Sequence, residues 1–209
     1  MINAVGRDIP EEILKQTGKE VFQGNYYKDG KPFKKAGPMV TPVMNHDHDK
    51  MVKDIHEALV KCNAHDGMTV SFHHHFRDGD LVVCMVMKEI QKMGLKNITI
   101  SASSLGKAHD DLVPMIEDGT ITNIESSGVR GKIGEAISHG KLKGLATMRS
   151  HGGRVRALVT GETHVDIAFI GAPTCDEYGN CRGIGGKTNC GVLSYSYVDG
   201  NQADYVVAV

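Results

Sequence analysis

The chain has 209 residues, and its 24 basic and 25 acidic side chains give a formal net charge of -1 at pH 7. This balance excludes the general electrostatic attraction on which DNA, RNA and membrane-surface binding depends. Tryptophan is absent and aromatic residues make up 5% of the chain, so no platform for stacking single-stranded bases is expected. The length suits one sizeable domain or two small ones, with enough core to fold unaided.

Cysteine usage and the N-terminal sequence bear on where the protein resides. The five cysteines include no Cys-x-x-Cys pair. A chain of this size does not need disulfide bonds to fold, so reduced thiols are expected. The N-terminus, MINAVGRDIPEEIL, lacks the apolar segment of a signal peptide, and no apolar run approaches membrane-spanning length. The sequence therefore predicts a cytoplasmic protein that binds neither nucleic acid nor membranes.

The first part of the chain, residues 1–45, is polar and is broken up by glycine and proline. A short helix is expected just after Pro10, because proline and the acidic Glu11 and Glu12 suit a first helical turn. The remainder of this part is predicted to be an arm that wraps the surface of a domain formed by residues 46–209.

The most informative stretch, residues 68–94, predicts a strand, a loop and a helix. Residues 68–72 are partly β-branched and follow an Asp-Gly turn, as strands often do. From residue 80 to residue 93 apolar side chains recur at helical spacing, and Gly94 is placed to end the helix in a left-handed conformation. The intervening loop carries three histidines and an arginine. Loops at the carboxyl ends of parallel strands bind ligands beside helix N-termini, so an anion-handling site is expected here.

The rest of the chain alternates short apolar strands with helices. Further strands are predicted at residues 97–101, 121–126, 145–150, 165–171 and 205–209, and further helices at residues 47–62, 111–117 and 131–139. The strand at 165–171 is almost wholly apolar and is expected to be buried on both faces. This alternation implies right-handed crossovers, and hence an α/β fold with a mostly parallel twisted sheet flanked by helices. The last strand also looks buried, so the chain is expected to be the first half of a longer protein.

A second candidate ligand-binding segment is Ser150-His151-Gly152-Gly153-Arg154, which follows a predicted strand. Its glycines let the backbone come close to a ligand, and Arg154 can fork onto a carboxylate. The alternative is a glycine turn with a solvated arginine.

Two other patterns are weaker. The segment 183–188 ends in Gly-Lys-Thr but lacks the spacing of a nucleotide-binding P-loop, so a nucleotide-hydrolysing loop is not expected. Cys175, Cys181 and Cys190 lie close in sequence at irregular spacing and are interpreted as small buried residues or bystanders.

The three consecutive histidines do not form a metal-binding pattern. On an extended chain they point to opposite sides, and no fourth ligand is spaced for zinc. The sequence therefore predicts no metal site.

Several of these segments, taken in order, resemble a known family. Asp66-Gly67, the strand after it, Phe76 and Gly79 resemble the N-terminal signature of coenzyme A transferases, with two histidines where that signature has two glycines. More specifically, the α-subunit family of citrate lyase is similar in SFHHHFRDGD, SHGGRVRA, DIAFIGAPTCDEYGN and GIGGKTNCG. The resemblance runs from about residue 35 to Val209 and covers the first half of the family's subunit.

The resemblance implies a coenzyme A transferase-like (NagB/RpiA-like) fold and a transferase that exchanges acetate for citrate on the thioester of an acyl carrier protein or coenzyme A. In that family the exchange is thought to pass through an anhydride in a ternary complex, and the citryl thioester is then cleaved to acetate and oxaloacetate. The implied partners are citrate, the acetyl thioester of an acyl carrier protein subunit and the citryl lyase β subunit, in an oligomer. No tightly bound cofactor is implied, and the carrier's arm is of the phosphoribosyl-dephospho-coenzyme A type.

A tricarboxylate substrate requires cations, and hydrogen-bond donors where charge develops on a carbonyl oxygen. The predicted catalytic residues are therefore His74, His75 and Arg77. The predicted substrate-binding residues are Ser71, His73, Ser150, His151, Gly152, Gly153 and Arg154, and the resemblance places the thioester arm at Gly179, Asn180, Gly185 and Gly186. The alternative is a non-catalytic ligand-binding or sugar-phosphate-sensing module, because fold alone does not decide activity.

Overall fold

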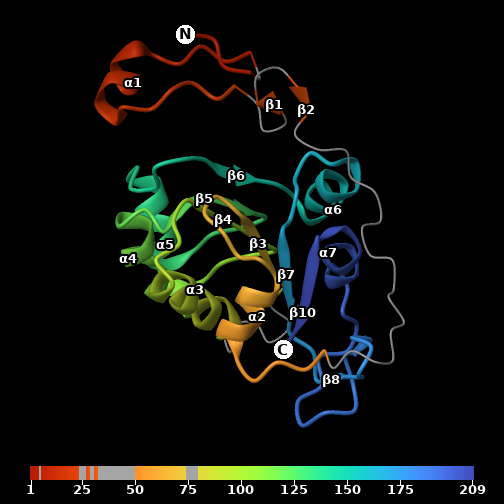
Figure 1. Cartoon of the computed structure of the whole chain (residues 1–209). Helices are drawn as coiled ribbons and strands as arrows, with labels where there is room; N and C mark the ends of the chain where they lie inside the picture. Colours follow the sequence, from red (N-terminus) through yellow and green to blue (C-terminus); the bar gives the residue numbers. More distant parts are fainter. Residues whose placement is uncertain (5, 24–26, 29–30, 33–49, 74–79) are drawn as a thin grey trace.

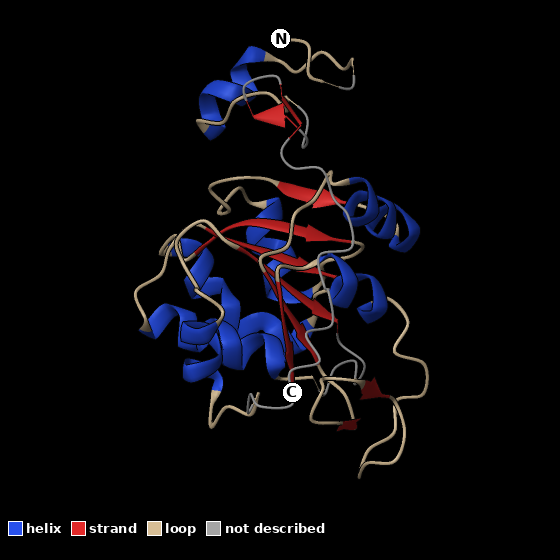
Figure 2. Cartoon of the chain, turned by 45° about the vertical axis from the view of Figure 1, so that its right-hand side comes forward, coloured by secondary structure: helices blue, strands red, loops and turns tan. Residues whose placement is uncertain are grey.

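The computed structural model describes residues 1–4, 6–23, 27–28, 31–32, 50–73 and 80–209. The main body is a six-stranded sheet with helices on both faces (Figures 1 and 2). Three small elements precede it, namely α1 (Glu11–Thr17), β1 (Tyr27–Lys28) and β2 (Lys31–Pro32). Helix α1 begins after Pro10 with two acidic residues in its first turn, as predicted. Among the described residues, no helix is both long enough and apolar enough to cross a bilayer.

The strands of the main sheet follow the order β10-β7-β3-β4-β5-β6, and every pairing between them is parallel. Each of the six predicted strands is present. They are β3 (Thr69–His73), β4 (Ile98–Ala102), β5 (Ile121–Ser126), β6 (Ala146–Met148), β7 (Ile167–Ile170) and β10 (Tyr205–Ala208). The predicted α/β class with a mostly parallel sheet is confirmed.

The helices form two layers, one on each face of the sheet (Figure 1). One layer contains α2 (Ile55–Lys61), α3 (Val82–Lys92), the 3-10 helix η2 (Lys107–Leu112), α4 (Val113–Glu117) and α5 (Gly131–Ser138). The other contains α6 (His151–Thr160) and α7 (Ser196–Gln202), which pack against each other. Gly94 follows α3 with a φ of 78°, in the left-handed conformation predicted for it.

Two expectations about helices need correction. The described part of the helix predicted at 47–62 begins only after Asp54, whose carboxylate caps α2 by accepting a 2.8 Å hydrogen bond from the backbone N–H of Glu57. Helices α6 and α7 were not predicted. Glycines in both lower the intrinsic helix propensity, so packing on the sheet decides their conformation.

The core lies mainly between the sheet and the α3 layer. Its centre includes the stacked rings of Phe72 and Phe169, whose centroids are 5.6 Å apart. All four residues of β7 are buried, as predicted from their apolar sequence. A smaller cluster under α6 and α7 consists of Leu158, Val165, Ala168 and Ala203. Apolar side chains on both faces therefore hold the two helix layers on one sheet.

Strand β10 corrects another expectation. Among the described strands it lies at the edge of the sheet and pairs with β7 alone, and Tyr205 and Val206 are 44% and 39% exposed. The expectation of a buried strand was wrong, because an apolar run by itself does not distinguish an edge strand from an interior one.

The sheet changes winding direction between β3 and β7. The chain leaves β3 toward α3 on one face and leaves β7 toward α7 on the other (Figure 1). Neighbouring strands with diverging connections leave a crevice at their carboxyl ends, where α/β proteins bind ligands. His73 and Ile170 are register partners at these two ends. The fold therefore predicts a ligand-binding site at this edge of the sheet.

Candidate functional site

The histidine loop begins at the carboxyl edge of the sheet. His73 is the last residue of β3 and is half-buried. The predicted catalytic residues His74, His75 and Arg77 lie in residues 74–79, outside the described residues. Their roles stay predictions, while His73 fixes the edge from which that loop departs.

Five side chains meet at this edge, and we refer to them as the carboxyl-edge cluster: His73, Ser103, Ser127, His151 and Tyr195. The Ser103 hydroxyl lies 3.4 Å from Nδ1 of His73, and the Ser127 hydroxyl lies 3.4 Å from Nε2 of His151. Ser127 also donates a hydrogen bond to the Ser103 carbonyl. The Tyr195 ring lies near both imidazoles, with its centroid 5.6 Å from that of His73 and 5.0 Å from that of His151.

The cluster forms because parallel strands end on the same side. His73 ends β3, Ser103 and Ser127 follow β4 and β5, and His151 follows β6 as the first residue of α6. Tyr195 is the residue that immediately precedes α7. The His73 and His151 segments therefore share one rim of the sheet, although 78 positions separate the two residues in the numbering.

The N-terminus of helix α6 places a partial positive charge at this edge of the sheet. Ser150 caps the helix by accepting a 3.0 Å hydrogen bond from the backbone N–H of Gly153, and His151 is exposed next to it. The first turn of a helix carries backbone N–H groups without helical partners and a partial positive charge. Together with imidazole and hydroxyl groups, such a terminus can bind carboxylates.

Other residues predicted in this segment have structural positions. Gly152 and Gly153 belong to the first turn of α6, so the proposed glycine turn is wrong. A Cβ atom added at Gly152 would meet nothing within 4 Å, which leaves its surface open. Ser71 lies in the middle of β3 and is 0% exposed, so a ligand at the surface does not reach it.

Arg154 is buried and paired within the chain. Its guanidinium lies 2.8 Å from the Asp199 carboxylate on α7, and the two side chains are 3% and 2% exposed. A second nitrogen donates to the Ser101 hydroxyl at 3.2 Å. Burial raises the pKa of Asp199 above its ordinary value, although Arg154 acts in the opposite direction. Arg154 therefore forms an ion pair with a carboxylate of its own chain through one guanidinium nitrogen, and neither a solvated arginine nor a direct substrate contact is supported.

The segment predicted to hold the thioester arm forms a hairpin of β8 (Thr174–Cys175) and β9 (Cys181–Arg182) after β7. Asp176 accepts hydrogen bonds from the backbone and side-chain N–H groups of Asn180, both at 2.9 Å, and these bonds lower the pKa of Asp176. Gly179 and Gly185 have φ values of 89° and 92°, which favour glycine. The turn itself therefore accounts for these residues, and their contact with an arm stays a prediction.

Gly186 is required by close backbone packing. A Cβ atom there would lie 2.3 Å from the carbonyl oxygen of Pro173, far inside contact distance. Close packing of two backbone segments therefore requires glycine at this position, whether or not a ligand binds there. Its predicted role in arm binding is untested.

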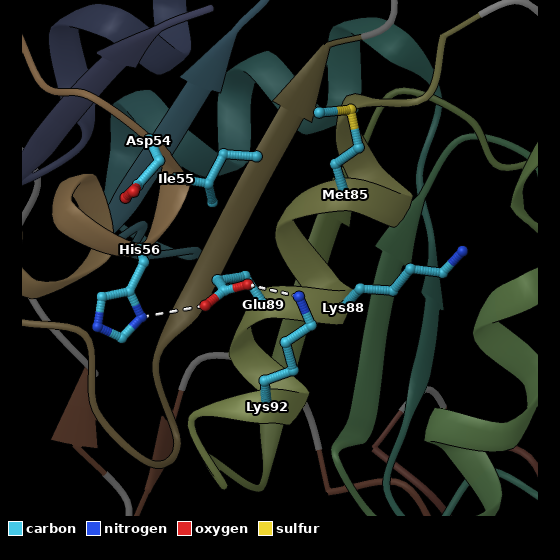
Figure 3. A pocket seen from close by; sticks show the side chains of 7 residues that line it. All are labelled: Asp54, Ile55, His56, Met85, Lys88, Glu89 and Lys92. Atoms are coloured by element: carbon cyan, nitrogen blue, oxygen red, sulfur yellow. Dashed lines mark hydrogen bonds and ion pairs between the residues drawn. The ribbon is translucent and has the colours of Figure 1, made fainter.

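A surface depression of about 520 Å³ lies elsewhere, between α2 and α3 (Figure 3). Glu89 at its centre contacts His56 at 3.0 Å and Lys92 at 3.1 Å, so its carboxylate is neutralised within the chain. The Lys92 and His56 contacts lower the pKa of Glu89. The depression is formed by helices on one face, whereas the carboxyl-edge cluster lies at the strand ends, and we do not assign it to the site.

One group of possible cation ligands lies at the opposite, amino-terminal edge. The His164 Nε2 atom is 2.8 Å from Asp204 and 3.6 Å from Asp166. Asp166 also accepts a 2.7 Å hydrogen bond from the backbone N–H of Thr69. These contacts join the starts of β3, β7 and β10. They explain why the three side chains lie close together without requiring a bound ion.

The sequence left four residues of this region unassigned: Ser103, Ser127, Tyr195 and Asp199. The two serines had a usable signal, because each lies within two residues of the carboxyl end of a predicted strand. Tyr195 and Asp199 had none, since they enter through α7, which was not predicted.

The fold and the carboxyl-edge cluster define a doubly wound parallel α/β protein with a candidate anion site at its switch point. The family model described as citrate lyase, alpha subunit (CitF), matches residues 48–209. The chain belongs to this family. The match begins later than the residue near 35 at which the resemblance was expected to start.

Relatives agree with this assignment. The chain is 49% identical over 158 residues to the citrate lyase alpha chain of Escherichia coli and 48% identical over 158 residues to that of Haemophilus influenzae. These matches cover 76% of this chain but 31% and 32% of the relatives. The matched part of the chain thus spans about a third of their length.

Solved structures show the same relationship. A crystal structure described as the alpha subunit of citrate lyase from Streptococcus mutans in complex with citrate is 48% identical, with a TM-score of 0.81. The similarity covers 99% of this chain and 39% of that one. A variant of the decarboxylase AibA/AibB is 17% identical with a TM-score of 0.50, covering 74% of this chain and 72% of that one, and shares the fold alone.

Proposed function

We propose that this chain contributes the citrate-binding part of a transferase that exchanges acetate for citrate on a thioester. The thioester belongs to an acyl carrier protein, or to coenzyme A, and carries an arm of the phosphoribosyl-dephospho-coenzyme A type. The product, a citryl thioester, passes to a lyase β subunit that cleaves it to acetate and oxaloacetate. The assembly is a cytoplasmic oligomer.

One observation carries the proposal: His73 and His151 converge on Tyr195 at the switch point of the sheet, in a member of the citrate lyase alpha-subunit family. The Streptococcus mutans relative, described as a complex with citrate, supports citrate as the ligand. A tricarboxylate matches a rim of imidazole, hydroxyl and backbone N–H donors, because each carboxylate can accept several charge-assisted hydrogen bonds.

The proposed exchange balances without a protein nucleophile. A citrate carboxylate attacks the acetyl carbonyl, the carbon–sulfur bond breaks, and the thiolate leaves a mixed anhydride behind. The thiolate then attacks the citryl carbonyl of that anhydride and releases acetate. Both additions place negative charge on a carbonyl oxygen, which fixed hydrogen-bond donors stabilise most when they are already in place.

In this scheme the described residues bind and orient citrate. His151 and the first turn of α6 hold one carboxylate, and His73 holds a second one nearer to the crevice between β3 and β7. The hydroxyl groups of Ser103 and Ser127 fix the two imidazoles, each through a contact of 3.4 Å. The loop residues His74, His75 and Arg77 are proposed to act on the developing oxyanion.

Calorimetric titration of citrate into the chain tests the binding site. The variants His73→Ala and His151→Ala each remove one donor to a charged group, a loss of about 1.5–3 kcal/mol. Their dissociation constants should therefore rise about tenfold to about a hundredfold. His139→Ala is the matched control, because His139 is exposed after α5 and away from the cluster.

Unchanged citrate affinity in both cluster variants would remove these residues from the site. A similar loss in the control would show that the effect is not local. Titration with sugar phosphates forms a second arm of the experiment: tighter binding of a sugar phosphate than of citrate would favour a sensing module over the transferase.

A further inference from the structure

Two cysteines face each other in the hairpin that follows β7. Cys175 in β8 and Cys181 in β9 are direct register partners in an antiparallel pair, and their sulfur atoms are 3.9 Å apart. The next pair along, Asp176 and Asn180, is joined by a 3.2 Å backbone hydrogen bond. The cysteines therefore occupy a non-hydrogen-bonded pair, where the side chains of the two strands approach most closely.

This geometry is close to that of a disulfide. A disulfide bond has a sulfur–sulfur distance of about 2 Å. The two sulfurs therefore need to approach by about 2 Å, which side-chain rotation can supply while the short hairpin keeps its register. Both thiols are free in the structure.

The two thiols differ in access, which gives the reaction an order. Cys175 is exposed, whereas Cys181 is half-buried. Burial, together with the nearby Cys175, raises the pKa of Cys181 to about 12. Because the thiolate is the nucleophile, Cys175 is the thiol that meets a reagent first.

Two of the three remaining cysteines, Cys62 and Cys84, are placed differently. Cys84 is buried in α3, where burial raises its pKa and its thiol donates to the Ala108 carbonyl. Burial also raises the pKa of Cys62. Neither shares the exposure or the facing thiol that distinguishes Cys175.

We propose that Cys175 and Cys181 form a redox-active dithiol, a modification site that low-molecular-weight disulfides oxidise to an intramolecular disulfide. The Cys175 thiolate attacks the reagent, forms a mixed disulfide and releases one small thiol. The Cys181 thiolate then attacks the Cys175 sulfur, closes the protein disulfide and releases the second small thiol. The chain loses two electrons and two protons, and the two released thiols gain them.

The closed ring would contain the turn at residues 176–180, which includes Gly179 and Asn180 from the predicted arm-binding set. Oxidation would thus lock a turn that hydrogen bonds to Asp176 now hold. This inference stands on the hairpin geometry alone and does not depend on the proposed function.

The test equilibrates the native chain with graded ratios of oxidised to reduced glutathione, and then alkylates the remaining thiols. A glutamate-specific protease cuts after Glu177, between the two cysteines, so a disulfide between them joins two fragments in the mass spectrum. We expect the chain to lose two of its five free thiols, with Cys62, Cys84 and Cys190 still alkylated at the same ratio.

Three variants separate the steps. Cys181→Ser should retain glutathione on Cys175, because the resolving thiol is gone, and Cys175→Ser should stay reduced. Cys190→Ser is the matched control and should oxidise as the unchanged chain does. Three results would each overturn the proposal: glutathione persisting on Cys175 of the unchanged chain, a disulfide to Cys190 instead, or oxidation of Cys175→Ser at the same ratio as the unchanged chain.

Discussion

Replacing Asp199 by asparagine tests whether the buried ion pair holds α6 against α7. The substitution keeps the shape of the side chain but leaves the Arg154 guanidinium, 3% exposed, without a countercharge. Removing one partner of a buried ion pair costs about 3–5 kcal/mol, because the other charge stays buried. In a domain of this size each kcal/mol lowers the melting temperature by about 2–4 °C, so a fall of about 6–20 °C is expected.

The assay is urea unfolding at 25 °C, followed by circular dichroism, with thermal unfolding as a second measurement. Asp111→Asn is the control, because Asp111 also forms an ion pair, with Lys88 at 3.0 Å, but is exposed. It should change the melting temperature little, since exposed ion pairs contribute little to stability. The double variant Arg154→Met, Asp199→Leu should recover much of the loss, because no unpaired charge remains. If Asp199→Asn unfolds at the same urea concentration as the unchanged chain, the reasoning is refuted.

Three further outcomes are expected. Burial alone would raise the pKa of Asp118, but hydrogen bonds from Thr120 and Gln91 and the Lys96 ammonium outweigh it and hold the pKa at about 2. A lowered pKa stabilises the folded chain above about pH 4, so Asp118→Asn should lower the free energy of unfolding there by about 1 kcal/mol, allowing for the exposure of Asp118. In urea titrations this difference should shrink as the pH falls from about 4 through about 2. Gly186→Ala should lower the free energy of unfolding by about 1–3 kcal/mol, because its Cβ atom would press against a carbonyl oxygen. The control Gly152→Ala, in open helical space, should leave this free energy unchanged or raise it. Equal effects of the two variants would contradict the packing argument. The 209-residue chain should bind citrate yet exchange acetyl and citryl groups slowly, and fast exchange of labelled acetate would contradict this.

Local sequence patterns predicted the strands better than the helices. Short β-branched runs between turn residues mark each strand, because the side-chain period of two and the turn chemistry are both local. Helix α6 was missed because His151-Gly152-Gly153 has weak helix propensity, although the Ser150 cap marks its start. Helix α7 carries Gly200 and two polar residues beside it, and it is stabilised by packing on β7 and β3.

The candidate site was likewise predicted only in part from the sequence. The sequence placed His73 and His151 at the ends of predicted strands, and a parallel sheet brings such ends to one edge. It could not show that Arg154 is buried, since the carboxylate that pairs with it comes from α7, 45 positions later in the numbering. A solvated arginine and a buried one look alike in sequence, because the difference is made by the partner.

The sequence by itself determined the class of fold, the number of parallel strands and the family, because these depend on local periodicity and on ordered motifs. Only the tertiary structure decided which strand lies at the edge, where the sheet reverses its winding, and which side chains meet at that reversal. It also brought Cys175 opposite Cys181, which irregular spacing had made look unrelated. Such contacts depend on strand order and register, and these are fixed by how buried surfaces pack across the whole chain.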